Sequence, residues 1–95
     1  MAVLTLKSAD MLQFPEILRE FASYKSVIEG CSEKTVCEYL LDLRTFFRYT
    51  ESRRLFIDAE SEDFNNIDIS VIDLDYIKKI KTETIYEYLM FVNQS

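Results

Sequence analysis

The chain has 95 residues, a net charge of −6 and an apolar fraction of 48%, with one glycine and one proline. This length suits a single domain with a modest core, and the scarcity of turn residues argues against both a disordered chain and a β-fold rich in tight turns. The lack of histidine excludes Ser-His and Cys-His nucleophiles and histidine-based metal sites. We therefore expect one mostly helical domain.

No stretch of the chain has the properties of a membrane or export segment. A run of about eighteen apolar residues is missing, and residues 1–14 lack the long apolar centre of a signal peptide. We expect a cytoplasmic protein with no membrane partner. Cys31 and Cys37 are separated by five residues, a spacing that fits neither the common zinc pairs nor a redox Cys-x-x-Cys, so we predict two free thiols.

The first predicted helix spans residues 15–29. Pro15 suits its first turn, where the missing N–H is no loss. An apolar face then repeats at helical spacing: Phe14, Leu18, Phe21, Tyr24 and Ile28. Gly30 can adopt the left-handed conformation that commonly ends a helix, so the chain is expected to reverse there into an antiparallel hairpin.

The second predicted helix starts after Ser32 and continues to about residue 52. The Ser32 side chain can accept a hydrogen bond from a first-turn N–H, and Glu33 suits the positive end of the helix dipole. The apolar stripe of this helix consists of Val36, Leu40, Leu43 and Phe47, widened by Tyr39 and Phe46. Such a stripe predicts one buried side.

An acidic connection, residues 58–77, follows a short apolar run formed by residues 55–57. It holds seven carboxylates and no cation: Asp58, Glu60, Glu62, Asp63, Asp68, Asp73 and Asp75. A solvated connection is the ordinary interpretation, and a site for a basic partner is the alternative. Ile67, Ile69 and Val71 alternate with polar residues but have no evident partner strand, so we predict an extended segment packed on the bundle.

Two short helices are predicted at the end of the chain. Asp73 is expected to cap the first one, with Leu74, Ile77 and Ile80 facing inward. Thr82 is expected to cap the second, which covers residues 83–92. The apolar stripe of the second consists of Ile85, Leu89 and Val92, with Tyr86 and Tyr88 beside it.

The order of residues from Ser32 to Tyr49 resembles that of a known family. Ser, two variable positions, Thr, three more, Tyr, two more, then Asp-Leu-Arg and a double Phe is similar to the second helix of the core-binding domain of tyrosine recombinases, which include phage integrases and Xer-type enzymes. Residues 14–32 resemble that domain's first helix and turn, and residues 67–92 resemble the third-helix region of members from Gram-positive bacteria. The resemblance covers residues 14–92.

The resemblance implies an all-α, SAM-like helical bundle of the integrase N-terminal core-binding type. Residues 1–95 would form one partial domain that lacks its last helix, and the catalytic domain would lie outside this chain. The piece itself would then not be an enzyme, although its parent would cleave and rejoin DNA. Apolar surface meant for the missing helix could be covered by a dimer.

Seven residues are predicted to contact double-stranded DNA under this resemblance. Lys34, Arg44 and Arg48 share one flank of the second helix, where Arg44 and Arg48 can reach neighbouring phosphates. Their alternative is ion pairing with Glu51, Asp42 or the acidic connection. Thr35 matches the family's threonine and would contact phosphate or serve only the local backbone. Lys78, Lys79 and Lys81 would touch phosphate from the third helix, or else be solvated helix-end charges.

Two functions remain open from the sequence. The first is a DNA-binding domain that clamps a recombination site, together with other recombinase protomers, for integration or recombination by a separate catalytic domain. No metal or cofactor is implied. The second is an acidic helical protein-interaction module without DNA binding. DNA binding requires Lys34, Arg44 and Arg48 to share one open face that residues 58–75 leave unblocked, whereas carboxylates covering that face would favour the module.

Overall fold

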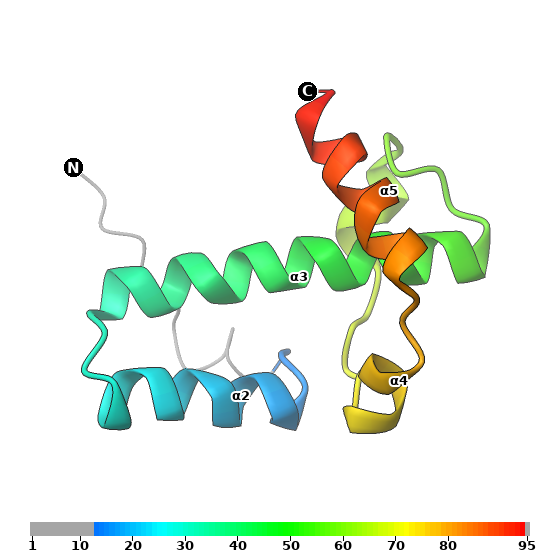
Figure 1. Ribbon diagram of the computed structural model, residues 1–95. Coiled ribbons are helices and arrows are strands. Elements are labelled where there is room, and N and C mark those ends of the chain that lie inside the picture. The colour runs from blue at the N-terminus through cyan, green and yellow to red at the C-terminus, as the bar shows by residue number, and fades with distance from the viewer. Residues whose placement is uncertain (1–12, 95) are drawn as a thin grey trace.

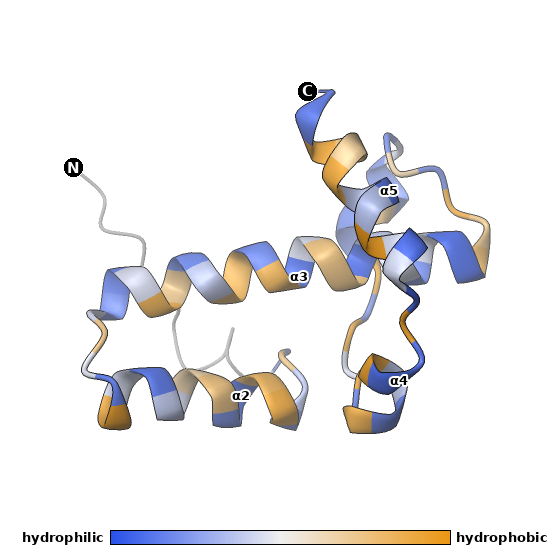
Figure 2. Ribbon diagram, viewed as in Figure 1, coloured by the Kyte–Doolittle hydropathy of each residue, from blue (hydrophilic) through white to orange (hydrophobic). Residues whose placement is uncertain are grey.

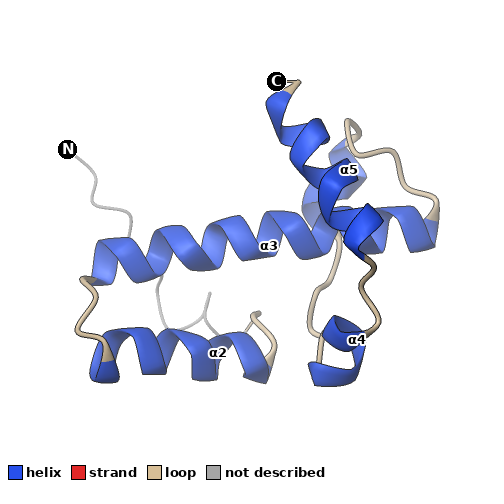
Figure 3. Ribbon diagram, viewed as in Figure 1, coloured by secondary structure: helices blue, strands red, loops and turns tan. Residues whose placement is uncertain are grey.

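The structure is a computed structural model that describes residues 13–94. These residues form helices and loops without any strand (Figure 1, Figure 3). The elements in chain order are α2 (Glu16–Ser23), the π-helix η1 (Tyr24–Ile28), α3 (Glu33–Leu55), the 3₁₀-helix η2 (Glu62–Asn66), α4 (Leu74–Lys78) and α5 (Thr82–Asn93). The predicted small all-α bundle is confirmed. The prediction that the chain begins without a signal peptide concerns residues outside the described range.

The predicted hairpin is formed by α2, η1 and α3, with α2 lying antiparallel along the first half of α3 (Figure 1). The first helical segment has the predicted extent, but its last part widens into a π-helix. Gly30 adopts a left-handed φ of 65°, as predicted for the reversal. The Ser32 Oγ accepts a hydrogen bond from the Thr35 N–H at 3.2 Å, which confirms the predicted cap of α3.

The core fills the space between α2, α3 and the segment after η2. Its buried members are Phe14, Leu18 and Ala22 from the α2 side, Val36, Leu40 and Phe47 from α3, and Ile69 and Ile72 from the later segment. Apolar residues of α2 and α3 face one another in Figure 2. Each large side chain buried here contributes about 1.5–3 kcal/mol. The predicted stripe of α3 is therefore the main inner face of the bundle.

The segment after η2 packs on the bundle as predicted, with one error of register. Ile67 and Ile69 are buried, but Val71 is 55% exposed and Ile72 is buried instead. The cause is a turn at residues 70 and 71, in which the Ile72 N–H donates to the Ile69 carbonyl at 3.1 Å. The turn breaks the alternation that the sequence pattern assumed.

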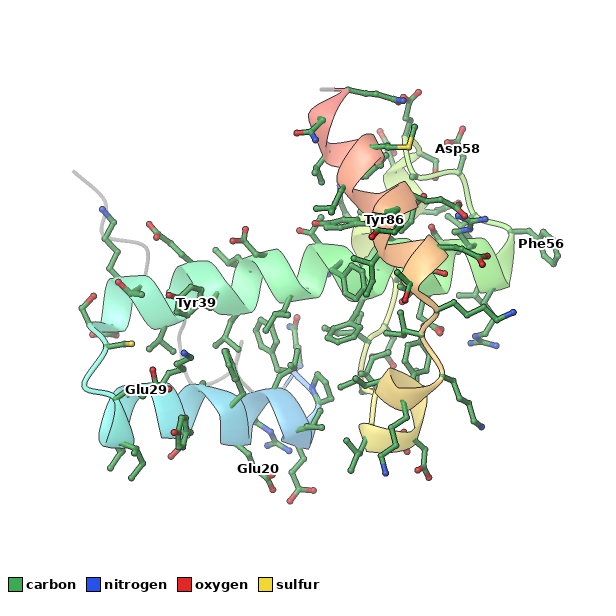
Figure 4. All side chains as sticks on the ribbon, in the orientation of Figure 1. Glu20, Glu29, Tyr39, Phe56, Asp58 and Tyr86 are labelled. Atoms are coloured by element: carbon green, nitrogen blue, oxygen red, sulfur yellow. The ribbon has the colours of Figure 1, made fainter. Side chains whose placement is uncertain are left out.

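The carboxyl end of α3 extends to Leu55, three residues beyond the prediction. Phe56 ends the helix in a left-handed conformation with φ of 57°. Its side chain is 96% exposed and points away from the bundle (Figure 4). The apolar run at residues 55–57 therefore does not form part of the core.

The last two helices confirm some of their predicted features. Asp73 caps α4 by accepting from the Tyr76 N–H at 2.8 Å, and Ile77 and Ile80 pack against the core. Leu74, predicted to face inward, is 53% exposed, whereas Ile72, just before the Asp73 cap, is buried. Thr82 is the first residue of α5 and not its cap, which is Lys81 without a side-chain bond. The Thr82 prediction was wrong by one residue.

Helix α5 contacts α3 through its aromatic side chains. The Tyr88 ring lies 5.0 Å from that of Phe46, and the Phe91 ring lies 5.0 Å from that of Tyr49, between centroids. Aromatic pairs at this separation add stability beyond their buried area. The predicted stripe of Ile85, Leu89 and Val92 consequently remains largely exposed among the described residues.

Candidate nucleic-acid interface

Arg44 and Arg48 lie one turn apart on α3, beside the core stripe. The Arg48 Nε–H donates to the Ile67 carbonyl at 3.3 Å. The Arg44 Nε is buried and has no hydrogen-bond partner within residues 13–94. Burial lowers the pKa of Arg48, and the charge of Arg44 lowers it further. The two guanidinium groups therefore lie close enough to repel one another.

A cavity of about 380 Å³ opens beside this pair. We call it the arginine pocket. Its polar and charged lining consists of Arg44, Arg48, Gln13, Asn65, Asn66, Asp68 and Ser70, and its apolar lining of Phe14, Ile67 and Ile69. Residues 65–70 lie beside Arg44 and Arg48 because Phe64, Ile67 and Ile69 are buried and hold the segment on α3. The face of these two arginines is therefore not fully open, contrary to the expectation for a DNA-binding flank, and Asp68 of the acidic connection lines the same cavity.

The carboxylate of Asp68 is directed to Ser70 and not to the arginines. Its two oxygens accept from the Ser70 backbone N–H and hydroxyl, each at 2.9 Å. These bonds, the backbone one foremost, lower the pKa of Asp68. Within residues 13–94, no carboxylate forms an ion pair with Arg44 or Arg48. The ion-pairing alternative for these two arginines is therefore not found in the described part of the chain.

Lys34 and Thr35 lie near the start of α3, away from the arginine pocket. Lys34 is exposed and lies about 15 Å before Arg44 along the axis of α3. The Thr35 hydroxyl accepts from the Ser32 hydroxyl at 3.0 Å and so takes part in the helix cap. Lys34 extends the cationic flank, whereas Thr35 has a local partner.

Lys79 and Lys81 line a second cavity of about 660 Å³, together with Arg53 and Arg54. We call it the basic cavity. Arg53 forms an ion pair with Glu87 of α5, and Arg54 pairs with Glu51. Lys78 is not part of the lining. The sequence showed Arg53 and Arg54 as adjacent cations, but nothing in it places them beside Lys79 and Lys81, since that proximity depends on how α4 and α5 pack.

Glu51 is the buried charge that sequence reasoning missed. It is 1% exposed, and Arg54 donates to its two oxygens at 3.0 and 2.7 Å. These hydrogen bonds are the main reason that the pKa of Glu51 is lowered, and Tyr76 contributes in the same direction. Burial raises the pKa of Tyr76 to about 12, and its hydroxyl lies 2.8 Å from that of Thr50. This network joins α3 to α4.

Other kinds of site are not found in residues 13–94. No helix there is long and apolar enough to cross a bilayer. No group of three or more Cys, Asp or Glu side chains there is placed to hold a metal ion. Cys31 and Cys37 are both free thiols, as predicted.

Comparison with known proteins gives one informative similarity. The chain is 37% identical over 87 residues to a protein described as "Tyrosine recombinase XerC" from Caldanaerobacter subterraneus subsp. tengcongensis. The sequence is thus related to part of a tyrosine recombinase. The match covers 92% of this chain and 24% of the relative, so the chain spans about a quarter of the relative's length. No family model and no solved structure matches the chain.

Proposed function

We propose that this chain is the DNA-binding, core-binding-type region of a site-specific tyrosine recombinase or integrase. The observation that supports the proposal best is the pair Arg44 and Arg48, which lies on α3 without a carboxylate partner in the described residues. The similarity to a tyrosine recombinase gives such a cationic pair a natural polyanionic partner. A separate catalytic domain of the parent protein would carry out cleavage and rejoining.

The proposed mechanism is a clamp on the phosphate backbone of a recombination site. Guanidinium groups suit phosphate because they can donate two parallel hydrogen bonds, and Lys34 would extend the contact along the duplex. Lys78, Lys79 and Lys81 are proposed as weaker contacts, and Thr35 as a contact only if its cap hydrogen bond is exchanged. Phosphate contacts position the protein without reading sequence. Other recombinase protomers bound at the paired site would be the protein partners. We propose that the protein acts in the cytoplasm and needs neither a membrane nor a cofactor.

The clamp is tested by duplex binding at about 50 mM salt, measured by fluorescence anisotropy. Arg44→Gln and Arg48→Gln are each expected to weaken binding about tenfold, the effect of one lost phosphate contact at this salt concentration. Lys25→Gln is the matched control, since it removes one charge from a residue that is already paired with Glu29. Equal affinities for the two arginine variants and the control would contradict the clamp.

An acidic protein-interaction module is the second candidate, and an exposed apolar face favours it. Tyr86, Leu89 and Met90 of α5 are exposed, and Ile85 also lines an apolar cavity of about 420 Å³ between the helices. We propose that this face joins two copies of the chain. Sedimentation equilibrium of the chain and of Leu89→Glu tests this. A dimer lost in the variant supports it, and a monomer at all concentrations contradicts it.

A further inference from the structure

We infer that the arginine pocket is a discrete receptor for one tetrahedral oxyanion of the phosphate class, held between α3 and residues 65–70. The inference rests on the proposed function, because a phosphodiester group of the DNA backbone would be the oxyanion bound in the assembled complex. It goes further in one respect. The pocket is expected to bind inorganic phosphate without any DNA.

The positive charges of Arg44 and Arg48 are not balanced by an ion pair. Two guanidinium groups lie together, and no carboxylate of the described residues pairs with either. Both arginines are half-buried, and even partial burial of a cation without an anionic partner costs free energy. An anion between the two groups would remove their mutual repulsion and supply the missing partner.

The arginine pocket also contains hydrogen-bond donors that have no acceptor in the described residues. Among the described residues, the buried Arg44 Nε–H has no acceptor, and Arg48 donates only through its Nε–H, to the Ile67 carbonyl. The terminal NH₂ groups of both guanidinium groups are therefore available to a ligand. The amide side chains of Asn65 and Asn66 line the same cavity and can donate through their NH₂ groups. Donors from two segments therefore converge on one space, as recognition of a multivalent acceptor requires.

Arg19 of α2 also has a buried Nε without a hydrogen-bond partner among the described residues. A single such nitrogen is therefore not sufficient evidence for a ligand. The arginine pocket differs because a second guanidinium, two amides and a cavity of about 380 Å³ accompany Arg44. That volume exceeds the share of a liquid water molecule about tenfold, so a hydrated oxyanion has room.

Asp68 provides a sharp test because it lines the pocket with the wrong charge for an anion. Its carboxylate is bound to Ser70 and is not needed to neutralise the arginines. Asp68→Asn keeps an acceptor for Ser70 and removes the repulsion. This variant is expected to bind phosphate about three- to tenfold more tightly than the wild type, because Asp68 is exposed and unit charges about 4 Å apart in water interact on this scale.

The experiment is an NMR titration of the 95-residue chain with inorganic phosphate, at constant ionic strength with chloride as the exchanged ion. Saturable shifts are expected at the amides of residues 65–70 and at the Nε–H groups of Arg44 and Arg48, with a dissociation constant below about 50 mM. Arg44→Gln should weaken binding about tenfold and Arg44→Lys by less, while Lys25→Gln should leave it unchanged. Should Arg44→Gln not fold, Asp68→Asn carries the test alone.

Added duplex DNA separates this inference from the proposed function. Displacement of phosphate from the pocket by the duplex supports both, and phosphate binding without DNA binding supports the receptor while contradicting the clamp. DNA binding that depends on Arg44, with no saturable phosphate shift at residues 65–70, would overturn the receptor and leave the clamp in place. An Asp68→Asn variant that binds phosphate no more tightly than the wild type would also count against the receptor.

Discussion

Two regions of α3 carry arginine pairs that differ in their partners. Arg44 and Arg48 have no carboxylate partner among the described residues, whereas Arg53 and Arg54, about two and a half turns further along, are paired with Glu87 and Glu51. The residue type and the helix are the same. What differs is the set of side chains beside each pair, which come from a neighbouring segment and, for Arg54, from α3 itself.

The packing explains why the two pairs are suited to different roles. Residues 65–70 bring amides and a carbonyl to the first pair, together with a carboxylate already engaged by Ser70. α5 and the buried Glu51 bring carboxylates to the second. The Arg53–Glu87 pair joins α3 to α5 and the Arg54–Glu51 pair lies within α3, whereas Arg44 and Arg48 retain their charge for a ligand. The residues beside each arginine therefore decide whether it stabilises the fold or is available to bind a ligand.

The largest expected effects on stability are in the Glu51–Arg54 pair. Glu51→Gln should lower the free energy of unfolding by about 2 kcal/mol, because it removes charge-assisted hydrogen bonds from a buried group. Arg54→Ala should be more destabilising than Glu51→Gln although Arg54 is the more exposed partner, because it leaves a buried carboxylate unpaired. Urea denaturation of both variants measures this. The reverse order would mean that Arg54 does not compensate the Glu51 charge.

The acid dependence of stability isolates the same pair. The folded-state pKa of Glu51 lies below its ordinary value near 4.5, chiefly through Arg54. Its contribution is therefore fully present above the unfolded-state pKa and is lost as pH falls through the folded-state value. Asp68 acts in the same direction through Ser70. Arg54→Gln should thus reduce the stability difference between pH 7 and pH 3 without abolishing it, and an unchanged difference would exclude the Glu51 contribution.

Arg53 and Arg44 should affect stability least, since neither forms a buried ion pair within residues 13–94. Arg53→Gln is expected to cost less than about 1 kcal/mol, since its pair with Glu87 is about half exposed. Arg44→Gln should change the free energy of unfolding by less than about 0.5 kcal/mol, in the stabilising direction, because it relieves repulsion with Arg48. Thermal unfolding checks both, and a large loss in Arg44→Gln would show that Arg44 has a structural role.

Local rules predicted much of the fold, because they depend on neighbours in sequence. The caps at Ser32 and Asp73, the reversal at Gly30 and the stripe of α3 all follow from such rules. The predicted cap at Thr82 was wrong by one residue, because α5 begins at Thr82 and its N-cap, Lys81, forms no side-chain hydrogen bond.

The same rules predicted only half of the candidate site. The proximity of Arg44 and Arg48 follows from their four-residue spacing. The position of residues 65–70 beside them does not, because it depends on where Phe64, Ile67 and Ile69 find apolar space on α3. The partner of Arg53 and the inward face of α5 depend likewise on tertiary packing of aromatic rings and carboxylates. The Arg54–Glu51 pair follows from three-residue helical spacing, but the burial of Glu51 does not.

The salt dependence of DNA binding tests the central claim most directly, because the slope of log affinity against log salt counts phosphate contacts. The slope for Arg44→Gln/Arg48→Gln should be smaller in magnitude than the wild-type slope by about 1.8, that is about 0.9 for each lost contact. Arg53→Gln should leave the slope within error of the wild type, because Glu87 already neutralises Arg53. Equal slopes for all three proteins would contradict the account.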